Sequence, residues 1–272
     1  MKMKNIHFKI HREGWIYVIF SSLLTIIFFP FFPYIGFIFT FLTLFIIIFF
    51  RDPKRVVPVE DMIISPADGR ITYIGESVAP KESNIKNKFL KISIFLNIFN
   101  VHINRVPTYG KVEKICYVSG KFFNATLDKS SKENERNIIV IKKNNSDLII
   151  VSQIAGLIAR RIVCNLQKND EILQGDRFGL IKFGSRVDLY LPLNYQTLVA
   201  VGQTVKGGET IISNPNNISK LISTIRRAAA FCAFLGSSFI DSGGTFHWLQ
   251  GPTSESSSSK SSTPSNLIVR GS

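Results

Sequence analysis

The sequence predicts a mainly β body, barrel-like or sandwich-like with some α, preceded by an N-terminal helical hairpin that spans or re-enters a membrane. Two observations predict this arrangement. Residues 15–50 contain no charged side chain, and after Pro53 short apolar runs alternate with Gly, Pro, Asn and Asp. With 272 residues, 45% of them hydrophobic, the chain can hold one domain of ordinary size and an extension.

The uncharged segment is too long for one helix across a membrane and slightly short for two, because one span needs about 20 apolar residues. Pro30 and Pro33 divide it. We expect a first helix that ends before Pro30 and a second that starts near Tyr34. Basic residues flank both ends, which places residues 1–14 and the body in the cytoplasm and makes residues 15–50 an anchor in the cell membrane. A buried helix pair in a soluble domain is the alternative.

Nine runs after Pro53 have the composition of β-strands. Their close spacing favours a barrel or sandwich over βαβ units. In the last run, Val187, Leu189 and Leu191 alternate with Asp188 and Tyr190, as they would on the two faces of one strand. The runs are residues 56–59, 62–64, 70–74, 89–95, 111–117, 137–141, 148–154, 180–183 and 187–191.

The charge balance points to an anionic partner, since 33 Lys and Arg residues against 19 Asp and Glu residues give a formal net charge of +14. Nucleic acid and acidic lipid headgroups are the two usual partners of such a chain. The sequence shows no recognisable RNA-binding or DNA-binding motif, and the uncharged segment favours lipid. Cys116, Cys164 and Cys232 stand apart, without metal-binding or disulfide-framework spacing, which is typical of a reducing compartment.

The Gly184-Ser185 dipeptide stands at the start of the last alternating run. If the Ser185 hydroxyl reached the Gly184 carbonyl, an N-to-O acyl shift followed by β-elimination would break the chain and leave a pyruvoyl group in place of Ser185. Glycine suits the electrophilic position because it has no Cβ to obstruct the attack. Gly-Ser pairs are also common in turns, so the dipeptide alone leaves an ordinary turn at the strand entry open.

Seven motifs occur in order along the chain. They are Phe-Phe-Arg-Asp-Pro at 49–53, Ser-Pro-Ala-Asp-Gly at 65–69, Phe-Leu-Asn at 95–97 with Val-His-Ile-Asn-Arg-Val-Pro at 101–107, Gly-Lys-Phe-Phe-Asn-Ala at 120–125, Asn-Glu-Arg at 134–136, Gln-Ile-Ala-Gly at 153–156 and Phe-Gly-Ser-Arg at 183–186. Together they resemble the short, membrane-anchored bacterial form of phosphatidylserine decarboxylase, and the resemblance covers residues 11–212.

The resemblance implies a pyruvoyl enzyme made as a proenzyme. Self-cleavage between Gly184 and Ser185 would give a larger β chain, residues 1–184, and a smaller α chain, residues 185–272, that begins with a covalent pyruvoyl group (pyruvate) formed from Ser185. That group would form a Schiff base with phosphatidylserine from an anionic membrane leaflet and release carbon dioxide and phosphatidylethanolamine. The resemblance implies no metal and no diffusible cofactor. It leaves open a higher homo-oligomer and an ether-linked serine lipid as substrate.

The resemblance also implies roles for two residues of the body. His102 is the only histidine in the predicted body, and its motif favours proton transfer over a structural role. Asp68, in a Pro-Ala-Asp-Gly turn, would help to activate Ser185 for self-cleavage, although Asp is also an ordinary turn former.

Three arginines are candidates for binding substrate anions. Longer bacterial enzymes of this family carry a second histidine where this chain has Arg105, and arginine cannot act as a general base near neutral pH. The group that deprotonates Ser185 is therefore open, and Arg105 would bind a carboxylate or phosphate instead. Arg160 and Arg161 are further candidates, with a solvated charged face as the alternative.

Residues 51–213 make up the predicted body, and residues 214–272 differ from it in composition. They are rich in Ala, Ser and Gly and end in a low-complexity run, so we expect a disordered or non-native tail. This tail contains a second pair, Gly236-Ser237, which matches the processing motif of longer family members better. We still expect cleavage at Gly184-Ser185, because cutting at Gly236 would leave an α chain too short and polar to form core strands.

Two other classes of function remain open from the residues alone. A non-enzymatic, membrane-tethered β-domain, such as a carrier-like adaptor, would make Gly184-Ser185 merely a turn and would remain a single uncut polypeptide. A membrane-associated nucleic-acid binder is suggested by the charge alone, and its binding would weaken uniformly with salt.

Overall fold

The structure, a computed structural model, describes residues 9–58, 62–120, 133–156, 161–182 and 185–215. Its first elements are a 3-10 turn η1 (Arg12–Gly14) and the helices α1 (Trp15–Phe28) and α2 (Pro33–Phe49). Pro33 occupies the first turn of α2, where its missing N–H costs no helical hydrogen bond. The predicted pair of helices is confirmed, with α1 ending before Pro30 and α2 beginning one residue before Tyr34.

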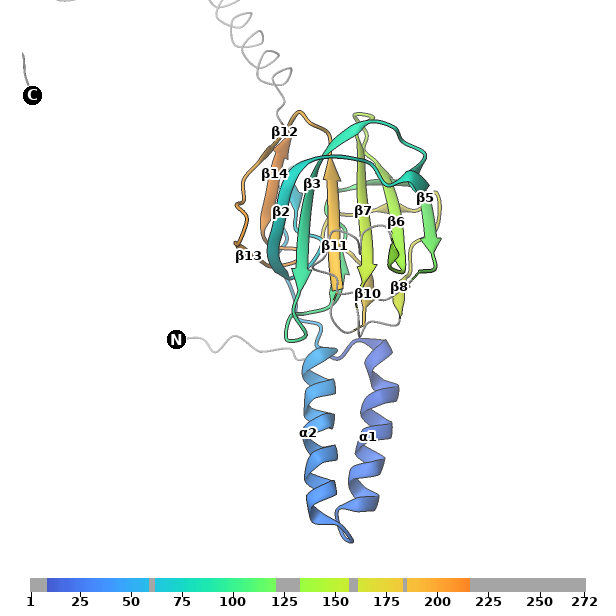
Figure 1. Ribbon diagram of the computed structural model, residues 1–272, viewed down its shortest axis with the longest axis vertical. Coiled ribbons are helices and arrows are strands. Elements are labelled where there is room, and N and C mark those ends of the chain that lie inside the picture. The colour runs from blue at the N-terminus through green and yellow to red at the C-terminus, as the bar shows by residue number, and fades with distance from the viewer. Residues whose placement is uncertain (1–8, 59–61, 121–132, 157–160, 183–184, 216–272) are drawn as a thin grey trace, which may run out of the picture. The chain divides into compact units, whose positions relative to one another are not determined.

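The two helices lie side by side (Figure 1). Thr43 of α2 donates a hydrogen bond to the Ser21 hydroxyl of α1 at 3.0 Å, whereas many Phe, Ile and Leu side chains of the hairpin are exposed. α1 has 14 residues and α2 has 17, and no helix in the described part of the chain is long and apolar enough to cross a membrane. Pro30 and Pro33 divide the apolar segment into these two helices.

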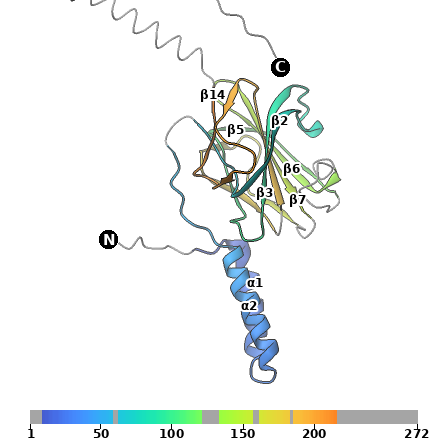
Figure 2. The ribbon, with the colours of Figure 1, turned by 60° about the vertical axis from the view of Figure 1, so that its left-hand side comes forward.

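The body is built on one eight-stranded sheet in which all neighbouring strands are antiparallel. In spatial order its strands are β13 (Thr204–Val205), β2 (Gly69–Val78), β3 (Lys88–Leu96), β11 (Ser185–Leu191), β7 (Leu148–Ala155), β6 (Arg136–Lys142), β5 (Gly110–Val118) and β9 (Glu171–Ile172). The sheet is curled like half of a barrel (Figure 2), which agrees with the mainly β, barrel-like body expected from the sequence.

Two three-stranded antiparallel sheets complete the body. The first has the order β1 (Ile63–Ile64), β14 (Ile211–Pro215) and β12 (Tyr195–Thr197), and the second has the order β4 (Ile103–Arg105), β10 (Arg177–Ile181) and β8 (Ile162–Cys164). A 3-10 turn, η2 (Lys81–Ser83), lies between β2 and β3 in the chain. The second small sheet matters for the site, because β4 directly follows His102 and β10 ends four residues before Ser185.

Eight of the nine predicted runs contain strands, namely β1, β2, β3, β5, β6, β7, β10 and β11. In the run at residues 180–183, β10 ends at Ile181, and residue 183 lies outside the described residues. The prediction of a strand at residues 56–59 is wrong, because residues 56–58 are irregular and Val56 is 83% exposed. The prolines at 53 and 58 cannot donate to a sheet ladder, which explains why no strand forms there. Residue 59 lies outside the described residues. The remaining strands are absent from the prediction because each has only two to five residues and pairs with a segment distant in the sequence.

The strand β11 lies in the middle of the large sheet, between β3 and β7. Val187, Leu189 and Leu191 enter the main apolar core, and Tyr190 enters a second cluster on the opposite face. The predicted alternation is confirmed, but all seven residues of β11 are buried, as in a strand that is covered on both faces.

Gly69 is required where β2 begins beside β3. A Cβ at Gly69 would overlap the backbone oxygen of Phe95, whereas a Cβ at Gly75 in the same strand would meet the end of the Tyr73 side chain. We expect Gly69→Ala to lower the free energy of unfolding by about 1–3 kcal/mol, the usual cost of overpacking, and Gly75→Ala to have a much smaller effect. Equilibrium urea unfolding of both variants checks this; equal losses would show that the contact with Phe95 is not the cause.

Candidate active site

Ser185 is the first residue of β11. Leu96 of β3 and Ala155 of β7 lie opposite it on the two sides, and its side chain has no exposed surface. Its hydroxyl oxygen has no hydrogen-bond partner among the described residues. A buried hydroxyl without a partner is costly, so it indicates a chemical or ligand-binding role. Gly184, the other half of the predicted cleavage site, lies outside the described residues.

Asp68 lies directly before β2, at the same end of the sheet as Ser185. Arg70 of β2 and Arg186 of β11 both pair with Phe95 of β3. The first residues of β2 and β11 are therefore two strands apart, a distance of about 10 Å between backbones. The sheet register thus brings two of the predicted site residues, Asp68 and Ser185, to the same end of the strands.

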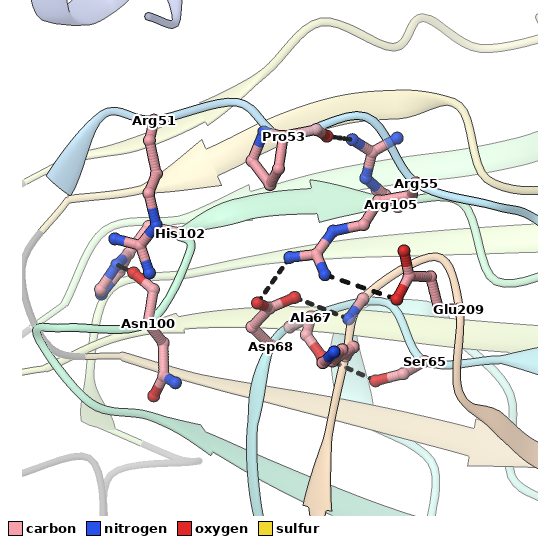
Figure 3. Close-up of polar contacts among 12 residues, drawn as sticks. Arg51, Pro53, Arg55, Ser65, Ala67, Asp68, Asn100, His102, Arg105 and Glu209 are labelled. Atoms are coloured by element: carbon pink, nitrogen blue, oxygen red, sulfur yellow. Dashed lines mark hydrogen bonds and ion pairs between the residues drawn. The ribbon is translucent and has the colours of Figure 1, made fainter. Parts of the chain in front are cut away.

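The Asp68 carboxylate is held from two sides (Figure 3). Arg55 Nη2 donates to Oδ2 at 2.7 Å, and the backbone N–H of Gly207 donates to Oδ1 at 2.7 Å. Burial raises the pKa of the Asp68 carboxyl above its ordinary value, and the Arg55 charge and the Gly207 hydrogen bond offset only part of that rise. A carboxylate with a raised pKa is a better proton acceptor than an exposed aspartate.

His102 lies in the loop between β3 and β4, and its side chain is almost completely buried. Nδ1 lies 2.9 Å from the Asn100 carbonyl oxygen, which can only accept, so Nδ1 carries the proton. Nε2 is then the basic nitrogen, and it has no partner among the described residues. Burial lowers the pKa of His102 to about 4, the Asn100 carbonyl opposes this shift, and the Arg51 charge adds to it. The ring is therefore neutral near pH 7, with Nε2 able to accept a proton.

The structure describes two of the three arginines expected to bind anions. Arg105 is buried, and its Nη2 donates to the Pro53 carbonyl oxygen at 3.1 Å and lies 3.4 Å from Asp52 Oδ1. Arg161 is exposed, and Arg160 lies outside the described residues. Anion binding by these residues stays a prediction, and the structure shows that Arg105 already bonds to groups of the protein.

The sequence predicts no role in the site for Arg51, Arg55 or Asn104. Arg55 holds Asp68, and Arg51 extends toward His102 (Figure 3). The side chain of Asn104 is fully buried, and its nitrogen has no partner among the described residues. Two of these residues belong to quoted motifs, Arg51 at the end of the uncharged segment and Asn104 two positions after His102, so the motifs marked them without indicating their contacts.

Comparison with known sequences identifies the family. The sequence model described as phosphatidylserine decarboxylase matches residues 42–213. The phosphatidylserine decarboxylase proenzymes of Rickettsia typhi, Rickettsia prowazekii and Rickettsia felis are each 48% identical over 217 residues, which cover 79% of this chain and 94% of each relative. The matching proteins belong to a class of enzymes, the lyases that are made as proenzymes. The chain belongs to the phosphatidylserine decarboxylase family, whose covalent pyruvoyl group comes from a serine of the enzyme's own chain.

Family membership confirms the activity and the covalent pyruvoyl cofactor expected from the motifs, and it decides against the carrier-like adaptor. The described residues also suit a serine-derived group at position 185. Ser185 Oγ, His102 Nε2 and Asn104 Nδ2 are all buried polar atoms without a hydrogen-bond partner in the described part of the chain. That part contains no cluster of His, Cys, Asp and Glu side chains that could hold a metal ion.

The pKa of His102 depends on Phe49, at the end of α2, whose ring packs against the imidazole at a centroid distance of 4.2 Å. Phe49→Ala would admit water, so we expect the pKa of His102 to rise from about 4 toward its ordinary value of 6.5. A proton NMR titration, with the His102 signal assigned by His102→Gln, measures the shift. The control is Phe45→Ala, which removes a ring that packs on Phe49 and not on His102. An equal shift of the His102 pKa in this control would show that Phe49 is not the specific cause.

The lowered pKa of His102 also makes the free energy of unfolding depend on pH. Because the unfolded chain binds the proton more tightly, folding stability falls as the pH drops from 6.5 toward about 4. The loss is at most about 1.4 kcal/mol per pH unit, and Phe49→Ala should narrow the pH window in which it occurs.

Proposed function

We propose that this chain cuts its own backbone between Gly184 and Ser185 and that Ser185 becomes the pyruvoyl group of the decarboxylase. The observation that carries the proposal is the Ser185 hydroxyl, buried at the first residue of the central strand without a hydrogen-bond partner among the described residues. Two neighbouring strands fix the backbone there, so the hydroxyl is positioned but not engaged. The second pair, Gly236-Ser237, lies beyond the region that matches the family.

The cleavage needs only atoms of the chain and one water molecule. Ser185 Oγ adds to the Gly184 carbonyl carbon and the peptide nitrogen departs, so an ester replaces the amide. Removal of the Ser185 α-proton then breaks the Cβ–Oγ bond, and Gly184 keeps both oxygens as the carboxylate of a new C-terminus. The dehydroalanine left at position 185 takes up water, loses ammonia and becomes the pyruvoyl group.

Asp68 and His102 have separate roles in this proposal. The raised pKa of Asp68 suits it to accept the proton of Ser185 during self-cleavage, with Arg55 holding the carboxylate in place. His102 serves the decarboxylation, because its neutral ring holds Nε2 ready for proton transfer in a site from which Phe49 excludes water. The pyruvoyl group supplies the electron sink for the electron pair that carbon dioxide leaves behind.

The two chains formed by cleavage would stay together. The α chain, residues 185–272, contributes β11, β12, β13 and β14, whereas the β chain, residues 1–184, contributes the strands that precede them. β11 is bonded to β3 on one side and to β7 on the other, and β13 and β14 pair with β2 and β1. Four strand pairs and the shared core would therefore hold the two chains together after the peptide bond is broken.

We further propose that the hairpin holds the body at the cytoplasmic side of an anionic leaflet of the cell membrane, where phosphatidylserine is available. The exposed apolar side chains of α1 and α2 support this placement, as does the net charge of +14. Two short helices favour a re-entrant or peripheral anchor. Each well-placed Lys or Arg adds about 1 kcal/mol of attraction to such a leaflet.

The mass of the purified protein tests the processing. We expect two polypeptides that match residues 1–184 and 185–272, the second lighter than its sequence by one ammonia, because pyruvoyl replaces serine. Ser185→Ala should give one uncut chain, whereas the control Ser237→Ala should be cut as in the wild type. A wild-type chain that ends at Gly236 would contradict the assignment.

Two conservative variants test the division of roles. We expect Asp68→Asn to accumulate the uncut chain, because the proton acceptor for Ser185 is lost. His102→Gln should be cut normally, but its kcat for phosphatidylserine in mixed micelles should fall by about 10²–10⁴, the usual contribution of general acid–base catalysis. Mass spectrometry and carbon dioxide release measure the two effects. Normal cleavage in Asp68→Asn, or an uncut His102→Gln, would show that the roles are assigned wrongly.

A further inference from the structure

We propose that Arg51 binds the phosphodiester of the lipid headgroup beside His102, an inference that rests on the proposed roles of Ser185 and His102. Arg51 follows α2, where the hairpin joins the body. Its guanidinium is fixed by two backbone carbonyls: Nη1 donates to Ile48 and Nη2 donates to Phe99, each at 2.7 Å. Carbonyl oxygens orient the planar fork but leave its positive charge uncompensated.

Among the described residues, the charge of Arg51 has no close counter-ion. No carboxylate lies within ion-pair distance of Arg51 in the described part of the chain, whereas Arg55 pairs with Asp68 at 2.7 Å. Partial burial is the main cause that lowers the pKa of the Arg51 guanidinium, the Asp68 charge opposes this shift, and the Arg55 charge adds to it. A partly desolvated guanidinium with no carboxylate is a favourable site for an anion, because a charge-assisted bidentate bond replaces lost hydration.

The position of Arg51 matches the chemistry of the substrate. Figure 3 shows its side chain reaching toward His102, and its charge lowers the pKa of that imidazole, so the two groups share one region. His102 Nε2 is buried and has no partner among the described residues. In phosphatidylserine, one oxygen and one methylene separate the phosphorus from the α-carbon that loses carbon dioxide. A phosphodiester on Arg51 would therefore hold this carbon near His102.

The energetics favour the phosphodiester over the carboxylate of the serine headgroup. The carboxylate loses its charge as carbon dioxide leaves, so a cation bound to it would stabilise the ground state more than the transition state. The phosphodiester keeps its charge throughout the reaction. Arg51 then acts through binding alone, and its loss should raise KM while kcat changes little.

Calorimetric titration of the processed enzyme with two headgroup fragments tests the inference. Glycerophosphoethanolamine carries the amine and the phosphodiester, and O-methylserine carries the amine and the carboxylate. We expect Arg51→Gln to weaken the binding of glycerophosphoethanolamine by about 10–100-fold and to leave O-methylserine almost unaffected. The matched control is Lys54→Gln, which removes an exposed positive charge three positions away and should bind both fragments like the wild type.

Several outcomes would overturn the inference. These are an equal loss in Arg51→Gln and Lys54→Gln, a loss confined to O-methylserine, or inorganic phosphate binding to the wild type as tightly as glycerophosphoethanolamine. The mass of each protein is measured first, so an uncut wild type would contradict the proposed function and not the role of Arg51. If Arg51→Gln alone is uncut, Arg51→Lys carries the test, because it keeps the charge but loses the bidentate fork.

Discussion

The central position of β11 is the constraint on which the rest of the structure depends. Backbone ladders to β3 and β7 hold both of its edges, and both of its faces are buried. Val187 lies in the apolar core, whereas Asp188 on the opposite face forms an ion pair with Lys91 at 3.2 Å. A shift of one residue would move Asp188 into the apolar core and Val187 against the charged groups, which is prohibitively costly. The register is therefore unique, and it fixes where Ser185 begins the strand.

The hairpin and the body share the surroundings of the site. Lys182, three residues before Ser185, forms an ion pair with Glu13 at 3.1 Å and lies over the ring of Tyr17. At the other end of the hairpin, Phe49 covers His102. Side chains of residues 13–49 thus contact both segments that lead to the candidate site, so the hairpin helps to form the surroundings of that site.

Features set by local pattern could be predicted from the sequence, and features set by distant contacts could not. The uncharged segment with its two prolines predicts both helices within a few residues, but its composition alone does not show that each is too short for a span. The pairing of Arg55 with Asp68 and the covering of His102 by Phe49 join segments that no periodicity relates. Only the order of the motifs along the chain predicts a role for Ser185. The Gly-Ser dipeptide is common by itself, and the burial of Ser185 depends on β3 and β7, which are remote in the chain.

The strand order has a consequence for how such an enzyme is supplied. Under the proposed cleavage, β11 would lie between two strands of the companion chain and could not be withdrawn without opening the sheet, so the fragment with the prosthetic group would not be exchangeable between molecules. Each polypeptide would then yield one active centre, once. A centre destroyed by a side reaction could not be reloaded from a pool of free cofactor, and the cell could restore the lost capacity only by translating a new chain.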